Sequence, residues 1–132
     1  MNKEKYTLEY DMKSVPVMLL WNYIATPPGL SQWFADKVIQ EGKEFTFVWN
    51  KSEVYAAQIG VRLGSFIRFR WEEDDESVIG EKYFLELKIS VSEITENTTL
   101  SITDFAFDDE KESSRELWDH QIDILRRMLG CI

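Results

Sequence analysis

The chain contains one histidine and one cysteine, so nucleophilic or metal chemistry would have to use His120 or Cys131. Both lie in a C-terminal segment whose apolar residues recur at helical spacing. Along such a helix they are separated by about 16 Å, which is too far for the two side chains to act as a pair. His120 has no visible base partner, so we expect it at the surface or at a cavity edge rather than in a catalytic site. The sequence has no metal-ligand cluster, phosphate loop or dinucleotide motif, so we expect no catalytic residue, metal or cofactor.

Asp104 is the carboxylate most suited to a site, because it follows two apolar residues at strand spacing. If the alternation continues, Leu100, Ile102 and Asp104 share the inward face of one strand. A buried carboxylate requires a partner or a raised pKa, and both mark sites. If the alternation breaks near the strand end, Asp104 lies in solvent instead. The sequence leaves both possibilities open.

Two acidic stretches and two arginines have simpler explanations. Residues 72–76, EEDDE, lack the spacing and the glycine of a calcium loop, and they indicate a solvated hairpin tip. Residues 108–112, DDEKE, precede a helix whose dipole favours acids at that end. Arg68 and Arg70 alternate with large apolar residues, which predicts that they lie on the wet convex face of a sheet. A strand shifted by one residue would instead turn them inward as an anion site.

Alternating apolar and polar residues predict the strands that would position these side chains. The stretch YTLEYDM alternates and indicates a first, half-buried strand. Six more strands follow at hairpin spacing, with one apolar face each, as in an antiparallel sheet covered on one side. They are expected at residues 36–41, 44–50, 53–61, 65–73, 83–94 and 98–107.

The stretch IATPPGLSQWFADKV predicts a corner between two short helices. The first helix is expected over VPVMLLWNYIA, with Ser14 as its cap. Pro27 and Pro28 end it, because the residue before a proline avoids helical angles. A second short helix is expected over LSQWFAD.

A long helix is expected at the end of the chain. Ser113 and Glu116 have the spacing of a capping box, and Gly130 is placed to end the helix. Between them, apolar residues recur at helical period and predict a broad apolar stripe. They are Leu117, Trp118, Ile122, Ile124, Leu125, Met128 and Leu129.

Composition limits the classes of function. The 132 residues fit one domain, expected to span residues 1–132, and 44% are hydrophobic, which argues against disorder. The net charge of −9 argues against nucleic acid and against an anionic membrane surface. No apolar run reaches membrane-spanning length, and the first residues lack the apolar core of a secretory signal. We therefore expect a cytoplasmic protein without membrane insertion, and the single cysteine agrees with this.

Four stretches together resemble the START-like (SRPBCC) superfamily, nearest to the group of activator of Hsp90 ATPase homologues and polyketide cyclase-like proteins. They are IATPPGLSQWFADKV, GSFIRFRWEED, ITENTTLSITDFAF and ELWDHQIDILRRML. The resemblance implies an α+β helix-grip fold of order β-α-α-β6-α. In that fold a curved antiparallel sheet of about seven strands surrounds a long C-terminal helix, and two short helices close one end.

The resemblance also implies a cavity between sheet and helix, and hence a non-catalytic domain that binds a small apolar or lipid-like ligand. Trp33 is expected either at the mouth of the cavity or in the core, and Phe34 in the core. The six residues expected to form the ligand site are Trp33, Trp49, Phe69, Trp71 and Trp118 as walls and Asp104 as a polar anchor.

Two other functions fit the same resemblance. One is a protein-interaction module, chaperone-linked as in the Hsp90 activator homologues. The other is a cyclase- or hydrolase-like enzyme that uses Asp104 or His120 as acid or base. The sequence names neither the ligand nor a partner, and it does not give the oligomeric state.

Overall fold

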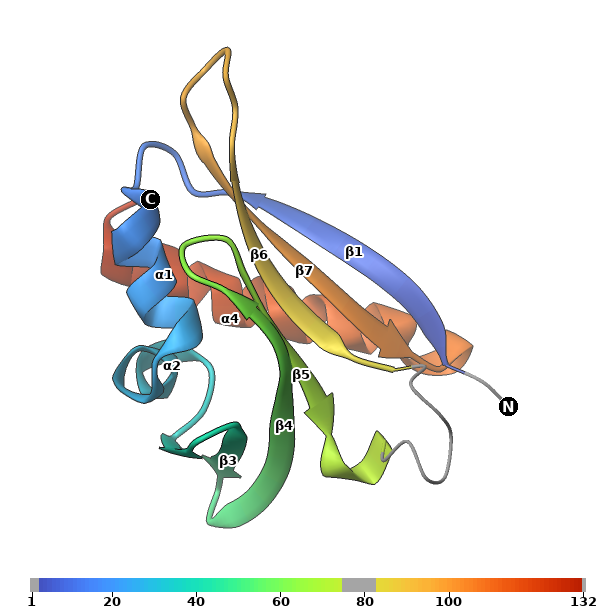
Figure 1. The fold of residues 1–132 in the computed structure, drawn as a ribbon. Helices are drawn as coiled ribbons and strands as arrows, with labels where there is room; N and C mark the ends of the chain where they lie inside the picture. Colours follow the sequence, from blue (N-terminus) through green and yellow to red (C-terminus); the bar gives the residue numbers. More distant parts are fainter. Residues whose placement is uncertain (1–2, 75–82, 132) are drawn as a thin grey trace.

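A computed structural model describes residues 3–74 and 83–131 and has the α+β helix-grip arrangement (Figure 1). Seven antiparallel strands form one curved sheet in the order β1-β7-β6-β5-β4-β3-β2, and the long helix α4 runs across one face of it. The elements are β1 (Glu4–Asp11), α1 (Val17–Ala25), α2 (Pro27–Trp33), β2 (Lys37–Glu41), β3 (Glu44–Trp49), β4 (Ser52–Arg62), β5 (Phe66–Trp71), the 3₁₀ turn η1 (Glu72–Asp74), β6 (Leu85–Val91), β7 (Thr98–Ala106), the 3₁₀ turn η2 (Asp108–Glu110) and α4 (Lys111–Leu129). The fold expected from the sequence is confirmed.

The register of the sheet confirms the predicted faces of the strands. On β5, Phe69 lies in the core, whereas Arg68 lies on the opposite face and pairs with Glu86 of β6. There the Arg68 Nε donates to Glu86 at 3.0 Å, and the guanidinium lies 4.4 Å from the centre of the Phe84 ring. The arginine is therefore part of a surface ion pair and does not form an anion site inside the grip.

The corner between α1 and α2 differs in detail from the prediction. The two prolines do not form a turn between the helices: Pro27 is the first residue of α2, where a missing N–H costs nothing. Thr26 is extended and caps α2 by accepting a hydrogen bond from the Gly29 N–H at 3.2 Å. The second helix therefore begins three residues earlier than LSQWFAD indicates and ends at Trp33.

Ser14 does not cap α1, because it lies in a turn and the extended Pro16 comes between it and the helix. Pro16 has φ −59° and ψ 138° and occupies the capping position without a side-chain hydrogen bond. Its carbonyl accepts from the Leu20 N–H at 3.1 Å, so the first helical bond forms two residues beyond Ser14. The predicted cap was wrong for this reason.

The predicted capping box of the last helix was also wrong. The 3₁₀ turn η2 leads directly into α4, so the helix begins at Lys111 and Ser113 is already inside it. The Ser113 hydroxyl donates to the carbonyl of Glu110 at 3.0 Å instead of capping. Gly130 ends the helix in the left-handed conformation with φ 74°, as expected.

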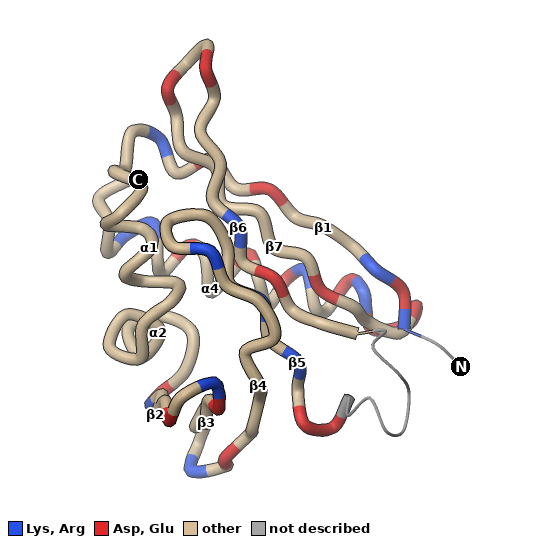
Figure 2. Tube along the Cα trace, in the orientation of Figure 1, with Lys and Arg blue, Asp and Glu red and all other residues tan. Residues whose placement is uncertain are grey.

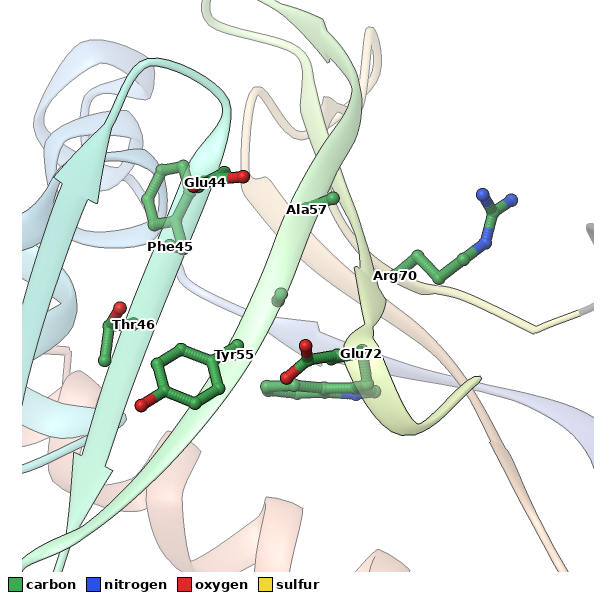
Figure 3. Close-up of a pocket in the computed structure, with 9 residues that line it drawn as sticks. Glu44, Phe45, Thr46, Tyr55, Ala57, Arg70 and Glu72 are labelled. Carbon is green, nitrogen blue, oxygen red and sulfur yellow. The ribbon is translucent and has the colours of Figure 1, made fainter. Parts of the chain in front are cut away.

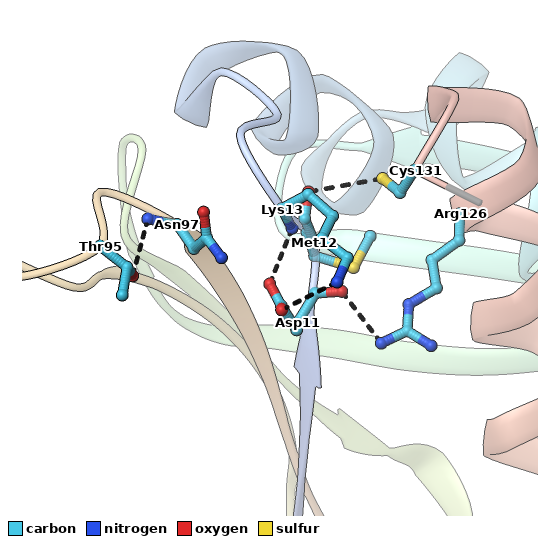
Figure 4. A network of polar contacts seen from close by, with 7 residues as sticks. All are labelled: Asp11, Met12, Lys13, Thr95, Asn97, Arg126 and Cys131. Carbon is cyan, nitrogen blue, oxygen red and sulfur yellow. Dashed lines mark hydrogen bonds and ion pairs between the residues drawn. The ribbon is translucent and has the colours of Figure 1, made fainter.

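The C-terminal end of α4 is tied to the end of β1 (Figure 4). Arg126 donates to the carbonyl of Asp11 at 2.9 Å, and the Cys131 thiol lies 3.4 Å from the carbonyl of Met12. Met12 is fully buried beneath these contacts. This end of the grip is therefore closed by side chains of the C-terminal segment that contact the backbone at the end of β1.

Acidic and basic residues are interspersed along the chain and do not gather on one basic face (Figure 2). This distribution agrees with the net charge of −9 and gives no duplex footprint over the described residues. Of the helices in residues 3–74 and 83–131, none is both long and apolar enough to cross a membrane.

Candidate functional site

The middle of the grip is solid. Inward-facing side chains of four strands meet α4 there, and each is at most 1% exposed. They are Phe45 and Phe47 of β3, Ile67 and Phe69 of β5, Leu85 and Leu87 of β6, Leu100 and Ile102 of β7, and Ile122 and Leu125 of α4. Among the described residues, these side chains fill the middle of the grip.

A hollow of about 360 Å³ lies beside the N-terminal half of α4, and we call it the grip pocket. It opens between the end of α2, the ends of β3 and β5, the last part of β7 and one face of α4. Its lining residues are Phe34, Trp49, Trp71, Asp104, Ser114, Leu117, Trp118 and Gln121.

Phe34 joins the elements around the grip pocket. Its carbonyl accepts two hydrogen bonds, from the Trp49 Nε1 at 2.8 Å and from the Gln121 amide at 3.1 Å. Its ring stacks on Trp118 with a centroid separation of 5.7 Å and meets Trp49 edge to face at 5.3 Å. Helix α2, strand β3 and helix α4 are thereby held around one aromatic cluster.

Trp71 extends the aromatic wall from β5. Its ring centre lies 5.4 Å from Phe47 and 6.2 Å from Trp49. Phe47 is fully buried, whereas Trp49 and Trp71 are only partly buried. The cluster therefore grades from solid core on one side to accessible indole rings at the pocket on the other.

Among the residues that the structure describes, Asp104 is the only charged one that lines the grip pocket. The alternation of β7 continues as far as Asp104, which opposes Tyr6 of β1 in the register. One carboxylate oxygen accepts from the Phe105 N–H at 2.8 Å. The other accepts from the Trp118 Nε1 at 3.2 Å and from the Tyr6 hydroxyl at 3.3 Å. The carboxylate faces α4, so the possibility that it lies in solvent is wrong.

Burial raises the pKa of both Asp104 and Tyr6. Loss of hydration raises the pKa of Asp104 above its ordinary value, while the donors Phe105, Trp118 and Tyr6 act in the opposite direction. Burial and the nearby Asp104 charge raise the pKa of Tyr6 to about 12. The phenol is therefore protonated at neutral pH and donates to the carboxylate.

A second hollow of about 580 Å³ lies over β3, β4 and β5, and we call it the strand pocket (Figure 3). Thr46 and Tyr55 oppose each other there on neighbouring strands, and Tyr55 is 46% exposed. Arg70 points away from them in Figure 3. The strand pocket is lined by Glu44, Phe45, Thr46, Tyr55, Ala56, Ala57, Arg70, Trp71 and Glu72. It shares only Trp71 with the grip pocket.

The structure brings four of the six residues expected at the site together at the grip pocket: Trp49, Trp71, Asp104 and Trp118. The other two lie elsewhere. Phe69 is 1% exposed in the solid core, and Trp33 is 5% exposed, with its Nε1 donating to the carbonyl of Tyr23 at 2.8 Å. Trp33 therefore takes the core position that the sequence had left open, and Phe34 lies between core and pocket.

Three further lining residues lie on α4, and their spacing in the sequence could have indicated them. Ser114, Leu117 and Gln121 stand with Trp118 at positions i, i+3, i+4 and i+7, which is one face of a helix. The contribution of Tyr6 depends on which strand pairs with β7, and this pairing spans almost the whole chain.

Neither His120 nor Cys131 lines the grip pocket. His120 is exposed on α4, and Cys131 lies beyond the other end of that helix. Burial raises the pKa of the Cys131 thiol, which disfavours the reactive thiolate. Within the described residues, no group of three or more His, Cys, Asp or Glu could hold a metal ion. Of the acidic stretch 72–76, residues 75 and 76 lie outside the described residues.

Comparison with known proteins identifies the relatives of this chain. The family model described as START-like superfamily domain matches residues 1–131. The solution structure of BfR322 from Bacteroides fragilis is 43% identical, with 97% of this chain and 92% of that chain covered and a TM-score of 0.68. No curated protein sequence matched.

Two more distant structures share the fold. The solution structure of the Aha1 dimer from Colwellia psychrerythraea is 13% identical, with 96% of both chains covered and a TM-score of 0.77. The crystal structure of CalU16 from Micromonospora echinospora is 14% identical, with 96% of this chain and 76% of that chain covered and a TM-score of 0.70. At these identities the likeness concerns the fold alone.

Proposed function

The chain belongs to the START-like superfamily, and we propose that it is a non-catalytic member that binds a small, mostly apolar ligand in the grip pocket. The observation that carries this proposal is the contrast between the solid middle of the grip and the hollow at one end. The hollow is walled by partly buried indole rings and has one carboxylate. Ligand pockets of small molecules typically combine apolar walls with a few polar groups in this way.

The strand pocket is the competing location, and the two pockets can be separated by side chains that line only one of them. Leu117 lines the grip pocket and is 59% exposed, so its truncation should leave the core intact. Tyr55 lines only the strand pocket and is also accessible. These two residues give a matched pair of variants.

Binding of the neutral dye Nile red, followed by its fluorescence, tests the proposal. We expect saturable binding to the unmodified protein and weaker binding by Trp71→Ala. We also expect about fivefold weaker binding by Leu117→Ser, since loss of apolar contact costs about 0.8 kcal/mol per buried methylene. Tyr55→Ala should bind the dye as the unmodified protein does.

Two results would contradict the proposal. If no apolar probe binds at any accessible concentration, the protein does not use the grip pocket as a ligand site. If Tyr55→Ala loses the dye and Leu117→Ser retains it, the ligand site is the strand pocket.

The alternative function, an interaction module linked to chaperones, stays a prediction. Only 13% of residues are identical to those of the Aha1 dimer, so this likeness supports a shared fold and nothing more. The enzymatic alternative is less supported than ligand binding. His120 is exposed and lies outside the pocket, and among the described lining residues Asp104 has no second acid or base beside it.

A further inference from the structure

The grip pocket carries negative charge. If the proposed function is correct, this charge restricts the class of ligand. Asp104 lines the pocket, and none of the other described lining residues is Lys or Arg. No ion pair joins Asp104 to a basic residue within residues 3–74 and 83–131. The charge of Lys3 lowers the pKa of Asp104, but the Lys3 ammonium lies over the rings of Tyr83 and Phe107, at 5.3 and 5.8 Å from their centres.

The hydrogen bonds of Asp104 favour the ionised form and leave room for one more donor. Two of its three partners are N–H groups, of Phe105 and Trp118, and these can only donate. The third is the hydroxyl of Tyr6. A carboxylate offers about four lone-pair sites, so roughly one is left for a ligand.

The walls add a second attraction for a positive charge. Three of the lining residues are Trp49, Trp71 and Trp118, and indole is the aromatic ring that attracts cations most strongly. Trp118 turns its N–H edge toward the carboxylate, at 3.2 Å. The ring faces that could attract a charged group next to Asp104 therefore belong to Trp49 and Trp71.

We propose that the grip pocket binds an apolar molecule that carries a protonated amine. The ammonium donates to the Asp104 carboxylate, and the apolar body lies against Trp49 and Trp71. A ligand carboxylate is disfavoured there because it would place two like charges together. A neutral hydroxyl could donate to Asp104 but would lack the charge.

Three probes that share a phenyl ring and a short chain test this inference at pH 7: 2-phenylethylamine, 2-phenylethanol and phenylacetate. Dissociation constants would be measured by isothermal titration calorimetry on the unmodified protein. We expect the amine to bind at least about tenfold more tightly than the alcohol, and phenylacetate to bind most weakly.

Two charge variants separate the site from the general field of the protein. Asp104→Asn keeps the shape of the side chain and removes its charge, so it should bind amine and alcohol equally well. Asp119→Asn removes a charge from an exposed residue of α4, which bonds to Tyr10 and does not line the pocket. It should retain the preference for the amine. Binding of the alcohol to each variant reports that the pocket is intact.

The results distinguish the inference from the function on which it rests. If the alcohol binds and the amine gains less than about threefold, the inference fails and the proposed function stands. A preference for the amine that survives Asp104→Asn also overturns the inference. If none of the three probes binds and Nile red does, the inference fails and the proposed function stands. If Nile red does not bind either, both proposals fail.

Discussion

At the scale of single residues, the partly buried carboxylate of Asp104 makes a testable contribution to the pH dependence of stability. Burial raises its pKa in the folded protein above the ordinary value of 3.8. The folded state therefore holds this proton more tightly than the unfolded chain does. The contribution of Asp104 to stability is complete below about pH 4 and is lost as the pH rises through the folded-state pKa.

Urea unfolding of the unmodified protein and of Asp104→Asn at pH 4, 5.5 and 7 isolates this contribution. We expect the free energy of unfolding of the unmodified protein, relative to that of the variant, to fall as the pH rises. Taking the difference cancels carboxylates such as Glu4 and Asp11, whose pKa values are lowered and whose linkage has the opposite sign. A difference that is flat or increases with pH would contradict the burial of Asp104.

Tyr6 provides an independent check on the same contact. Its pKa is raised to about 12, first by burial and then by the charge of Asp104. We expect carbon-13 NMR of the tyrosine rings to show Tyr6 ionising well above its ordinary value of 10.0. In Asp104→Asn the pKa of Tyr6 should fall toward that value, because one of the two causes is removed. Asp119→Asn, which removes the partner of Tyr10, should leave Tyr6 unchanged.

At the scale of elements, the sequence predicts secondary structure well where one residue type decides the backbone. Thr26 is extended because a proline follows it, and Gly130 ends α4 in the left-handed conformation. The errors concern where helices begin. Ser14 and Ser113 both have capping chemistry, but the backbone around Pro16 and in η2 decides the start of each helix. A side-chain pattern does not reveal these backbone conformations.

The close approach of α1 and α2 depends on Gly29. A Cβ atom added there would lie 1.9 Å from the carbonyl oxygen of Asn22 and 2.6 Å from the Cα of Tyr23. Both are backbone atoms, so no change of rotamer relieves the clash. We expect Gly29→Ala to lower the free energy of unfolding by at least about 2 kcal/mol, measured by chemical denaturation.

Gln32→Ala is the matched control, because Gln32 is exposed on the same short helix. It should change stability by less than about 0.5 kcal/mol. If Gly29→Ala is as stable as this control, the two helices can separate without cost, and the corner is not a rigid support for Phe34.

At the scale of the whole molecule, the sequence predicts the apolar inner face of the sheet but not where that face leaves a gap. Phe69 and Trp71 share the inward face of β5, yet Phe69 is 1% exposed in the core and Trp71 reaches the grip pocket. Phe69 packs between Phe45 and Phe47 of the core, whereas Trp71 contacts Phe47 and the partly buried Trp49. These contacts depend on packing between distant segments, which periodicity along one strand does not contain.

This division predicts different effects for one substitution in the core and one at the rim of the grip pocket. Phe69→Leu removes atoms from the solid core and should lower the free energy of unfolding by about 1–2 kcal/mol, with unchanged affinity for Nile red. Leu117→Ser acts at the exposed rim of the pocket. It should change the free energy of unfolding by less than about 0.5 kcal/mol and lower the affinity for Nile red. Denaturation and dye titration of both variants measure the two effects. Phe69→Leu could instead lower the affinity for Nile red as strongly as Leu117→Ser does. In that case the core and the pocket form one continuous cavity, and the middle of the grip is not solid in solution.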